Sequence, residues 1–265
     1  MAKFGHLGNF LVLCILLRII GSSHAQLQLN FYSKSCPKAE KIIQDYVQNH
    51  IPNAPSLAAA LLRLHFHYCF VRGGPYWNVP TGRRDGRISN ASEALANILP
   101  PTSNFSSLQT SFASKGFDLK DLVLLSGAHT IGISHCSSFS TRLYNFTGVL
   151  GTEDPSLDSE HAANLKARKC KSINDNTTIV EMDPGSFRTF DLSYFKLLLK
   201  RRGLFQSDAA LTTSATTKSY INQLVQGSLK QFYAEFTRAM EKMGRIEVKT
   251  GSAGDIRKQC AVVNS

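Results

Sequence analysis

Leu122–Gly132, LVLLSGAHTIG, is the stretch that decides the fold, because an apolar run there loses its bulk immediately before a histidine. Asp118 precedes the run and Asp121 follows three residues later, which is typical of a capped helix with carboxylates in its first turn. The small side chains at 126–128 would let a large flat molecule approach the backbone beside His129. The alternative is a core histidine behind a packed helix, and the stretch taken alone favours that alternative.

Apolar residues recur at helical spacing through most of the chain, and no strand pattern runs for more than a few residues. We therefore expect an all-α protein. The predicted helices cover 37–50, 56–70, 91–98, 105–115, 119–128, 133–144, 192–201 and 219–243. The segment 145–190 is expected to be mostly irregular. Gly203 lies just past the helix at 192–201, where a glycine often ends a helix.

The first 25 residues are typical of a signal peptide, with Lys3 near the start and an apolar core at 10–20. This core is too short to span a membrane, and no later stretch approaches the required length. Four Asn-x-Ser/Thr sequons agree with export, at Asn90, Asn104, Asn145 and Asn176. We expect a secreted, soluble glycoprotein that starts near Gln26.

The chain is basic, with a formal net charge of +11. The signal peptide carries Lys3 and Arg18 and no acidic residue, so its removal takes two positive charges away and leaves +9. One interpretation is an ordinary soluble basic surface. The other is attraction to an extracellular polyanion such as an acidic polysaccharide. No nucleic-acid-binding motif is present, and nucleic acid is not an expected partner.

The cysteine count is unusual for an exported protein. Six cysteines are present, and loss of Cys14 with the signal peptide leaves Cys36, Cys69, Cys136, Cys170 and Cys260. An odd number in an oxidising compartment leaves at least one thiol unpaired, or paired between chains. An incomplete domain would explain the odd count.

The predicted helix 56–70 holds the clearest chemical pair, Arg63 and His67, which lie at positions i and i+4 and hence on one face. Phe66 lies beside them. A neutral imidazole next to a fixed guanidinium can accept a proton beside a permanent positive charge. On spacing alone, a helix whose arginine and histidine face solvent is favoured. A metal site of His65 and His67 is weak, because they diverge by about 200° on a helix.

Six motifs occur in order along the chain: LLRLHFHYCFVRG, VPTGRRDG, DLVLLSGAHTIG, FDLSYF around Asp191, GLFQSD and GDIRKQC. Together they resemble the secreted plant haem peroxidases, the class III or guaiacol-type family, from Gln26 to the C-terminus. The resemblance implies an all-α fold with haem b between a distal part, here a truncated 26–117, and a proximal part, 118–265. We expect a monomer that uses hydrogen peroxide to oxidise small phenolic donors.

The resemblance assigns His129 as the axial ligand of the haem iron. Gly127 and Ala128 would leave the gap through which the haem reaches this histidine. Asp208 would accept a hydrogen bond from the other ring nitrogen of His129, which gives the imidazole anionic character and lowers the reduction potential of the iron.

On the distal side, the resemblance implies that His67 takes a proton from hydrogen peroxide and returns it to the departing oxygen. Arg63 would stabilise the negative charge that develops on that oxygen. Phe66 would contribute to binding the haem.

The family also binds two calcium ions, and the residues matching its proximal site are all oxygen donors, as calcium requires: Thr130, Asp183, Ser186 and Asp191, with the carbonyl of Thr189. Taken alone, the two aspartates would be ordinary solvated loop acids. Cys136 and Cys170 match a disulfide of the family.

Two departures from the family concern the distal part. Tyr68 stands where the family has an aspartate that binds the distal calcium, and a phenol is a poor ligand for that ion. Gly73 runs directly into Gly74, although these residues match the two ends of a long family segment of roughly three helices. Leu99 stands where the family has a proline near the channel for aromatic substrates.

The missing segment would hold the remaining distal calcium ligands and the partners of Cys36, Cys69 and Cys260. A lost native disulfide costs about 2–5 kcal/mol, and a domain has a net stability of only about 5–15 kcal/mol. We therefore expect a peroxidase of impaired activity that lacks the distal calcium. The alternative is a catalytically inactive secreted isoform that binds haem poorly or not at all.

Overall fold

The computed structural model describes residues 27–54, 79–259 and 262–264. The predicted signal peptide and the predicted helix 56–70 lie outside these residues. Several sequence predictions therefore cannot be compared with the structure, namely those for Arg63, Phe66, His67, Tyr68, Cys69, Cys260 and the junction of Gly73 with Gly74.

The described residues form two units. The smaller comprises the described residues within 1–37, 80–89 and 247–265. Bridges join Gln28 to Thr81 and Asp85 to Asp255. Arg257 donates twice to the loop at 85–86. Its guanidinium donates to the carbonyl of Gly86 at 3.0 Å, and the backbone N–H of Arg257 donates to the Asp85 carboxylate at 3.2 Å. The motifs VPTGRRDG and GDIRKQC therefore pack against each other.

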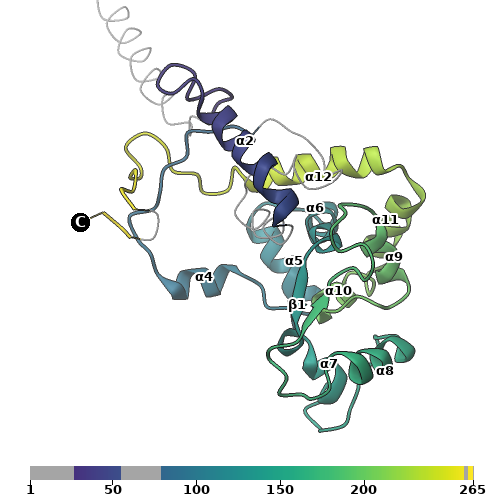
Figure 1. The fold of residues 1–265 in the computed structure, drawn as a ribbon. Helices are drawn as coiled ribbons and strands as arrows, with labels where there is room; N and C mark the ends of the chain where they lie inside the picture. The colour runs from purple at the N-terminus through teal and green to yellow at the C-terminus, as the bar shows by residue number, and fades with distance from the viewer. Residues whose placement is uncertain (1–26, 55–78, 260–261, 265) are drawn as a thin grey trace, which may run out of the picture. The chain divides into compact units, whose positions relative to one another are not determined.

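The larger unit comprises the described residues within 38–79 and 90–246 and contains the named helices and strands (Figure 1). Its α-helices are α2 (Ala39–His50), α4 (Ala91–Asn97), α5 (Phe105–Ser114), α6 (Leu119–Ser126), α7 (Ser140–Tyr144), α8 (Ser159–Arg168), α9 (Ser193–Leu199), α10 (Gln206–Ala210), α11 (Ala215–Gln226) and α12 (Leu229–Met243). Short 3₁₀ turns cover Ile51–Asn53, Gly127–Thr130 and Cys136–Ser138. The strands are β1 (Ile133–His135) and β2 (Ile179–Glu181). The predicted all-α class is confirmed.

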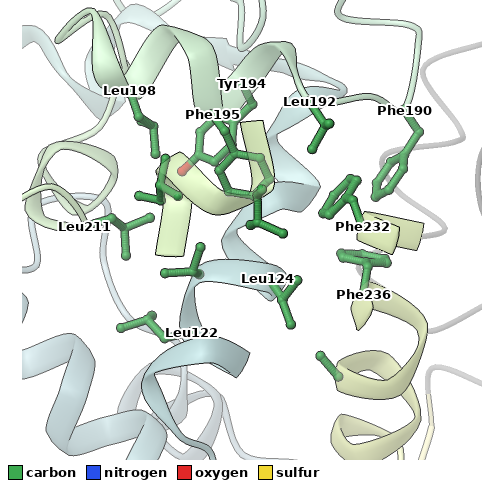
Figure 2. Packing of buried hydrophobic residues seen from close by; sticks show 14 of the residues in the cluster. Leu122, Leu124, Phe190, Leu192, Tyr194, Phe195, Leu198, Leu211, Phe232 and Phe236 are labelled. Atoms are coloured by element: carbon green, nitrogen blue, oxygen red, sulfur yellow. The ribbon is translucent and has the colours of Figure 1, made fainter. Parts of the chain in front are cut away.

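The main core is built around α6, which packs against α5, α11 and α12. Leu122, Val123 and Leu124 of α6 are buried. Figure 2 shows Phe195 from α9 and Phe232 from α12 meeting above this helix, and their rings pack edge to face. The apolar run 122–125 therefore forms the centre of the larger unit.

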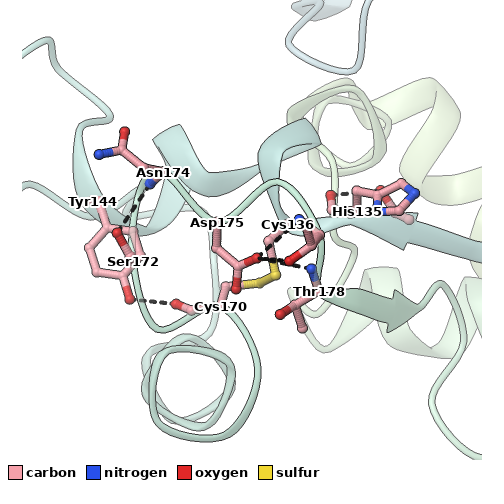
Figure 3. The surroundings of a disulfide bond; sticks show 10 residues. His135, Cys136, Tyr144, Cys170, Ser172, Asn174, Asp175 and Thr178 are labelled. Carbon is pink, nitrogen blue, oxygen red and sulfur yellow. Dashed lines mark hydrogen bonds between the residues drawn. A yellow bond between two sulfur atoms is a disulfide. The ribbon is translucent and has the colours of Figure 1, made fainter.

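A second, smaller core surrounds the disulfide between Cys136 and Cys170, the pair that the resemblance implied (Figure 3). β1 pairs antiparallel with β2, with Ser134 opposite Val180. Tyr144 at the end of α7 donates a hydrogen bond to the carbonyl of Cys170 at 2.5 Å. The disulfide, the strand pair and this tyrosine thus hold α7 and α8 together.

One prediction between residues 133 and 190 is wrong. The predicted helix 133–144 is helical only from Ser140, because Ile133–His135 pairs with β2 and a 3₁₀ turn follows it. The segment 145–190 is mostly irregular, as predicted, although it also contains α8 and β2. Asp158 caps α8 by accepting a hydrogen bond from the backbone N–H of His161.

Helix ends also differ from the prediction. The helix that opens at Leu119 ends at Ser126 and tightens into a 3₁₀ turn. The predicted helix 219–243 is two helices, because the chain breaks at Gly227 and Ser228 caps α12 by accepting from Gln231 N. α9 ends at Leu199, and the residue in the left-handed conformation after it is Arg201 rather than Gly203.

Candidate active site

His129 is carried by the 3₁₀ turn that follows α6. A capping box fixes the start of α6, since the Asp118 side chain accepts from Asp121 N and the Asp121 side chain accepts from Asp118 N. Gly127 does not leave a gap for a cofactor, contrary to the prediction. A Cβ atom at Gly127 would lie 2.9 Å from a carbon of the Phe195 ring and 3.1 Å from one of the Phe232 ring. The missing side chain makes room for core aromatics instead.

The imidazole of His129 is held by a buried carboxylate. Its Nδ1 lies 2.8 Å from Oδ1 of Asp208, 79 residues later in the chain. The Asp208 side chain is 1% exposed, whereas that of His129 is 37% exposed. Burial raises the pKa of Asp208, but His129, the Phe205 N–H and the Tyr194 hydroxyl together outweigh it, and the pKa lies below its ordinary value. An ionised carboxylate only accepts, so Nδ1 of His129 carries a proton, and Nε2 is the ring nitrogen that Asp208 does not engage.

Two further donors complete the surroundings of Asp208. The hydroxyl of Tyr194 donates to Oδ1 at 2.9 Å, and the backbone N–H of Phe205 donates to Oδ2 at 2.9 Å. The ring of Tyr194 stands edge to face against the His129 ring, with centroids 5.8 Å apart. Burial and the neighbouring carboxylate raise the pKa of Tyr194 well above its ordinary value, so the phenol stays protonated and donates. The sequence motif FDLSYF contains Tyr194, but its spacing does not reveal this contact.

Arg142 holds the segment that presents Asp208. Its side chain is fully buried, and one terminal nitrogen lies within 2.8–2.9 Å of three consecutive carbonyls, those of residues 203–205. Its Nε donates to the carboxylate of Asp154 at 2.6 Å, and its other terminal nitrogen donates to Ser156. Burial raises the pKa of Asp154, but Ser156 and Arg142 outweigh it and the pKa is lowered. No periodicity in the sequence links Arg142 to a loop 61 residues away.

Gly203 in the same segment is required for close packing. A Cβ atom there would lie 2.7 Å from Cδ2 of Leu198 and 2.8 Å from Cβ of Asp208. Both contacts are shorter than real Cβ contacts. Gly203 therefore lets the loop approach α9 and the base of Asp208, rather than ending a helix as predicted.

The residues predicted to bind the proximal calcium lie together. The hydroxyl of Thr130 lies 3.2 Å from Oδ2 of Asp183 and 3.3 Å from Oδ1 of Asp191, between the two carboxylates. The hydroxyl of Ser186 donates to the other oxygen of Asp191 at 2.7 Å. Asp183 is buried, and its burial and the charge of Asp191 raise its pKa to about 6. Such an excess of buried negative charge fits a cation bound by oxygen ligands.

Two other predicted residues lie within the described chain. Leu99 is partly buried and packs against the main core. Cys36 is exposed and forms no disulfide. Within the described residues, no helix is long and apolar enough to cross a membrane.

Comparison with known proteins identifies the family. The family whose model matches is described as peroxidase, and the match covers residues 72–227, more than half of the chain. Peroxidase 3 of Arabidopsis thaliana is 58% identical to the chain, and the match covers 94% of the chain and 96% of Peroxidase 3. Peroxidase 30 of the same plant is 54% identical over 96% of both chains.

Peroxidase 39 of Arabidopsis thaliana is 50% identical and covers 100% of both chains. That alignment extends over 329 positions, whereas the chain has 265 residues, so 64 positions hold no residue of this chain. The identities, the extent of the matches and the buried surroundings of His129 agree, and the chain belongs to the peroxidase family.

Proposed function

We propose that the chain is a haem peroxidase that binds haem b through His129 and oxidises small phenolic donors with hydrogen peroxide. Its family already makes it an oxidoreductase that uses hydrogen peroxide. The observation that carries the rest is the contact of His129 with Asp208. An imidazole whose Nδ1 donates to a buried carboxylate keeps Nε2 available as a basic metal ligand.

The residues present fit the prosthetic group on its proximal side. When bound, haem supplies an iron that exchanges electrons with peroxide and donors, which no side chain of this chain can do. His129 would hold the iron, and Asp208 would orient the imidazole and increase its basicity. Asp208 is itself fixed by Tyr194 and by the backbone of Phe205.

The distal roles rest on the matched motif alone. His67 would accept a proton from hydrogen peroxide and return it to the departing oxygen, as a general base and then a general acid. Arg63 would stabilise the negative charge on that oxygen. Phe66 would help to bind the haem, and Leu99 would lie near the donor.

We also propose that the proximal calcium is retained, bound by Thr130, Asp183, Ser186 and Asp191 with the carbonyl of Thr189. The carboxylate of Asp183, which is buried, and that of Asp191, which is half-buried, repel each other, and this supports the proposal. The distal calcium would be lost, because Tyr68 replaces its aspartate ligand.

Catalysis is proposed to be impaired by a missing distal segment between Gly73 and Gly74. The 64 unfilled alignment positions support the loss of a segment. So does α2, which buries Val47 but leaves Ile42 and Tyr46 60% and 63% exposed. Large exposed apolar side chains on an amphipathic helix indicate that a packing partner is lacking. The same observations also fit the alternative, a catalytically inactive secreted isoform that binds haem poorly or not at all.

The cellular setting is a proposal as well. The predicted signal peptide and the exposed sequons at Asn90 and Asn176 support secretion to the plant cell wall, where we propose that the chain is a monomer. The positive net charge supports weak attraction to acidic cell-wall polysaccharide.

Titration of the purified full chain with haemin tests the proposal. We expect saturable binding near one haem per chain with a histidine-ligated absorption spectrum. His129→Ala should abolish this spectrum, and His135→Ala, which changes an exposed histidine on β1, should keep it. Equal binding by His129→Ala would exclude His129 as the ligand. Absence of binding by the wild type would favour the inactive isoform.

A further inference from the structure

We infer that Tyr194 is a positioning residue that sets how strongly Asp208 acts on His129. This inference rests on the proposed function, because it concerns the same histidine, and it assigns Tyr194 an electronic effect beyond holding Asp208 in place. The side chain of Tyr194 is 1% exposed.

His129 and Tyr194 share one hydrogen-bond acceptor. The His129 Nδ1–H and the Tyr194 hydroxyl donate to the same oxygen, Oδ1 of Asp208, at 2.8 and 2.9 Å. The other oxygen of Asp208 accepts from Phe205 N. Each donor withdraws electron density from the carboxylate, so the phenol weakens the hydrogen bond that the imidazole forms.

The surroundings make this competition permanent rather than occasional. Tyr194 lies in the first turn of α9, and its ring packs edge to face on Phe195 and on His129. The ring cannot turn away into water, because it is enclosed by the main core. In such a low-dielectric environment a hydrogen bond to a charged acceptor acts more strongly than it does in water. Tyr194 therefore limits the anionic character of His129.

Tyr194→Phe tests the inference, because it removes the hydroxyl and keeps the ring. Tyr233→Phe is the matched control. Tyr233 also donates one hydrogen bond, to the carbonyl of Phe190 at 2.6 Å, but it does not contact Asp208. The measurement is the chemical shift of both ring nitrogens of His129 in the haem-free full chain with isotope-labelled histidine.

In Tyr194→Phe the Nδ1 shift should move in the direction of a stronger hydrogen bond to Asp208, whereas Tyr233→Phe should keep the wild-type shift. After haemin loading, the reduction potential of Tyr194→Phe should be more negative than that of the wild type. Equal shifts in all three proteins, or the same change in both variants, would overturn the inference. Failure of the wild type to bind haemin would instead contradict the proposed function, since the nitrogen shifts are measured without haem.

Discussion

His129 illustrates how a residue acquires its chemistry from neighbours distant in sequence. Its ring is part-exposed, but its Nδ1 contacts one of the most buried carboxylates of the described chain. The sequence motifs pointed to both His129 and Asp208. The motifs FDLSYF and GLFQSD contain Tyr194 and Gly203 but do not reveal their contacts, and no motif contains Arg142.

At the residue scale, Gly203→Ala should destabilise the protein. The added methyl group would overlap Leu198 and the base of Asp208, and overpacking of this kind costs about 1–3 kcal/mol. Urea unfolding at pH 7 measures the loss. Gly86→Ala is the control, because a Cβ atom there would lie 3.5 Å from the Ile88 carbonyl oxygen and 3.9 Å from Cε of Lys249, so its cost should be small. Equal losses in the two variants would show that Gly203 is not a packing constraint.

Asp183 gives a prediction about pH and calcium. Its folded-state pKa is raised to about 6, so without calcium its ionisation opposes folding. The cost is absent below the unfolded pKa near 3.8, grows between about pH 4 and 6, and is complete above that range. Asp183→Asn should therefore stabilise the calcium-free protein by about 1–2 kcal/mol at pH 7.

The same substitution should have the opposite consequence for calcium. Added calcium should raise the melting temperature of the wild type but not that of Asp183→Asn, because a ligand is lost. Asp175→Asn is the control, because the pKa of Asp175 is shifted in the opposite direction to that of Asp183. Hydrogen bonds from Thr178 lower the pKa of Asp175, so its loss should not stabilise the protein. A calcium response that survives in Asp183→Asn would contradict the assignment of this site.

At the element scale, helices marked by a capping residue, by prolines at an end or by an apolar stripe could be predicted from the sequence. α2, α4, α5 and α6 lie within two residues of their predicted starts. The strand Ile133–His135 could not, because its pairing partner lies 46 residues away in β2. α8 was missed because its polar composition leaves only Ala162 and Leu165 buried. Gly227 and Ser228 signalled the break between α11 and α12, but the apolar stripe continues across it.

Arg142 ties α7 to the loop before α10, and Arg142→Lys should loosen that connection. Lysine has one nitrogen and cannot contact three carbonyls, Asp154 and Ser156 together. Because the Arg142 charge is buried, loss of some of its hydrogen bonds and of its ion pair with Asp154 should lower the free energy of unfolding by about 3 kcal/mol. Arg202→Lys, at a partly exposed pair with Asp158 and Glu160, should cost under about 1 kcal/mol. A small effect at Arg142 would mean that the loop is held by other contacts.

At the scale of the whole molecule, the pairing of the cysteines tests whether a segment is missing. The chain after Gln26 has five cysteines, of which Cys136 and Cys170 are bonded. Intact mass after alkylation without reduction should show three modified thiols, or mixed disulfides between chains. One modified thiol and two intrachain bridges would show that the remaining cysteines find partners within the chain, contrary to our account.

The central claim is that this peroxidase keeps its proximal ligand and lacks part of its distal side. The most direct test is the rate of peroxide-dependent guaiacol oxidation per bound haem, compared with that of Peroxidase 3 of Arabidopsis thaliana. We predict His129-dependent haem binding with a rate at least about 100-fold lower, because general acid–base catalysis by a well-positioned histidine contributes about 10²–10⁴-fold. A rate per haem equal to that of Peroxidase 3 would contradict the account.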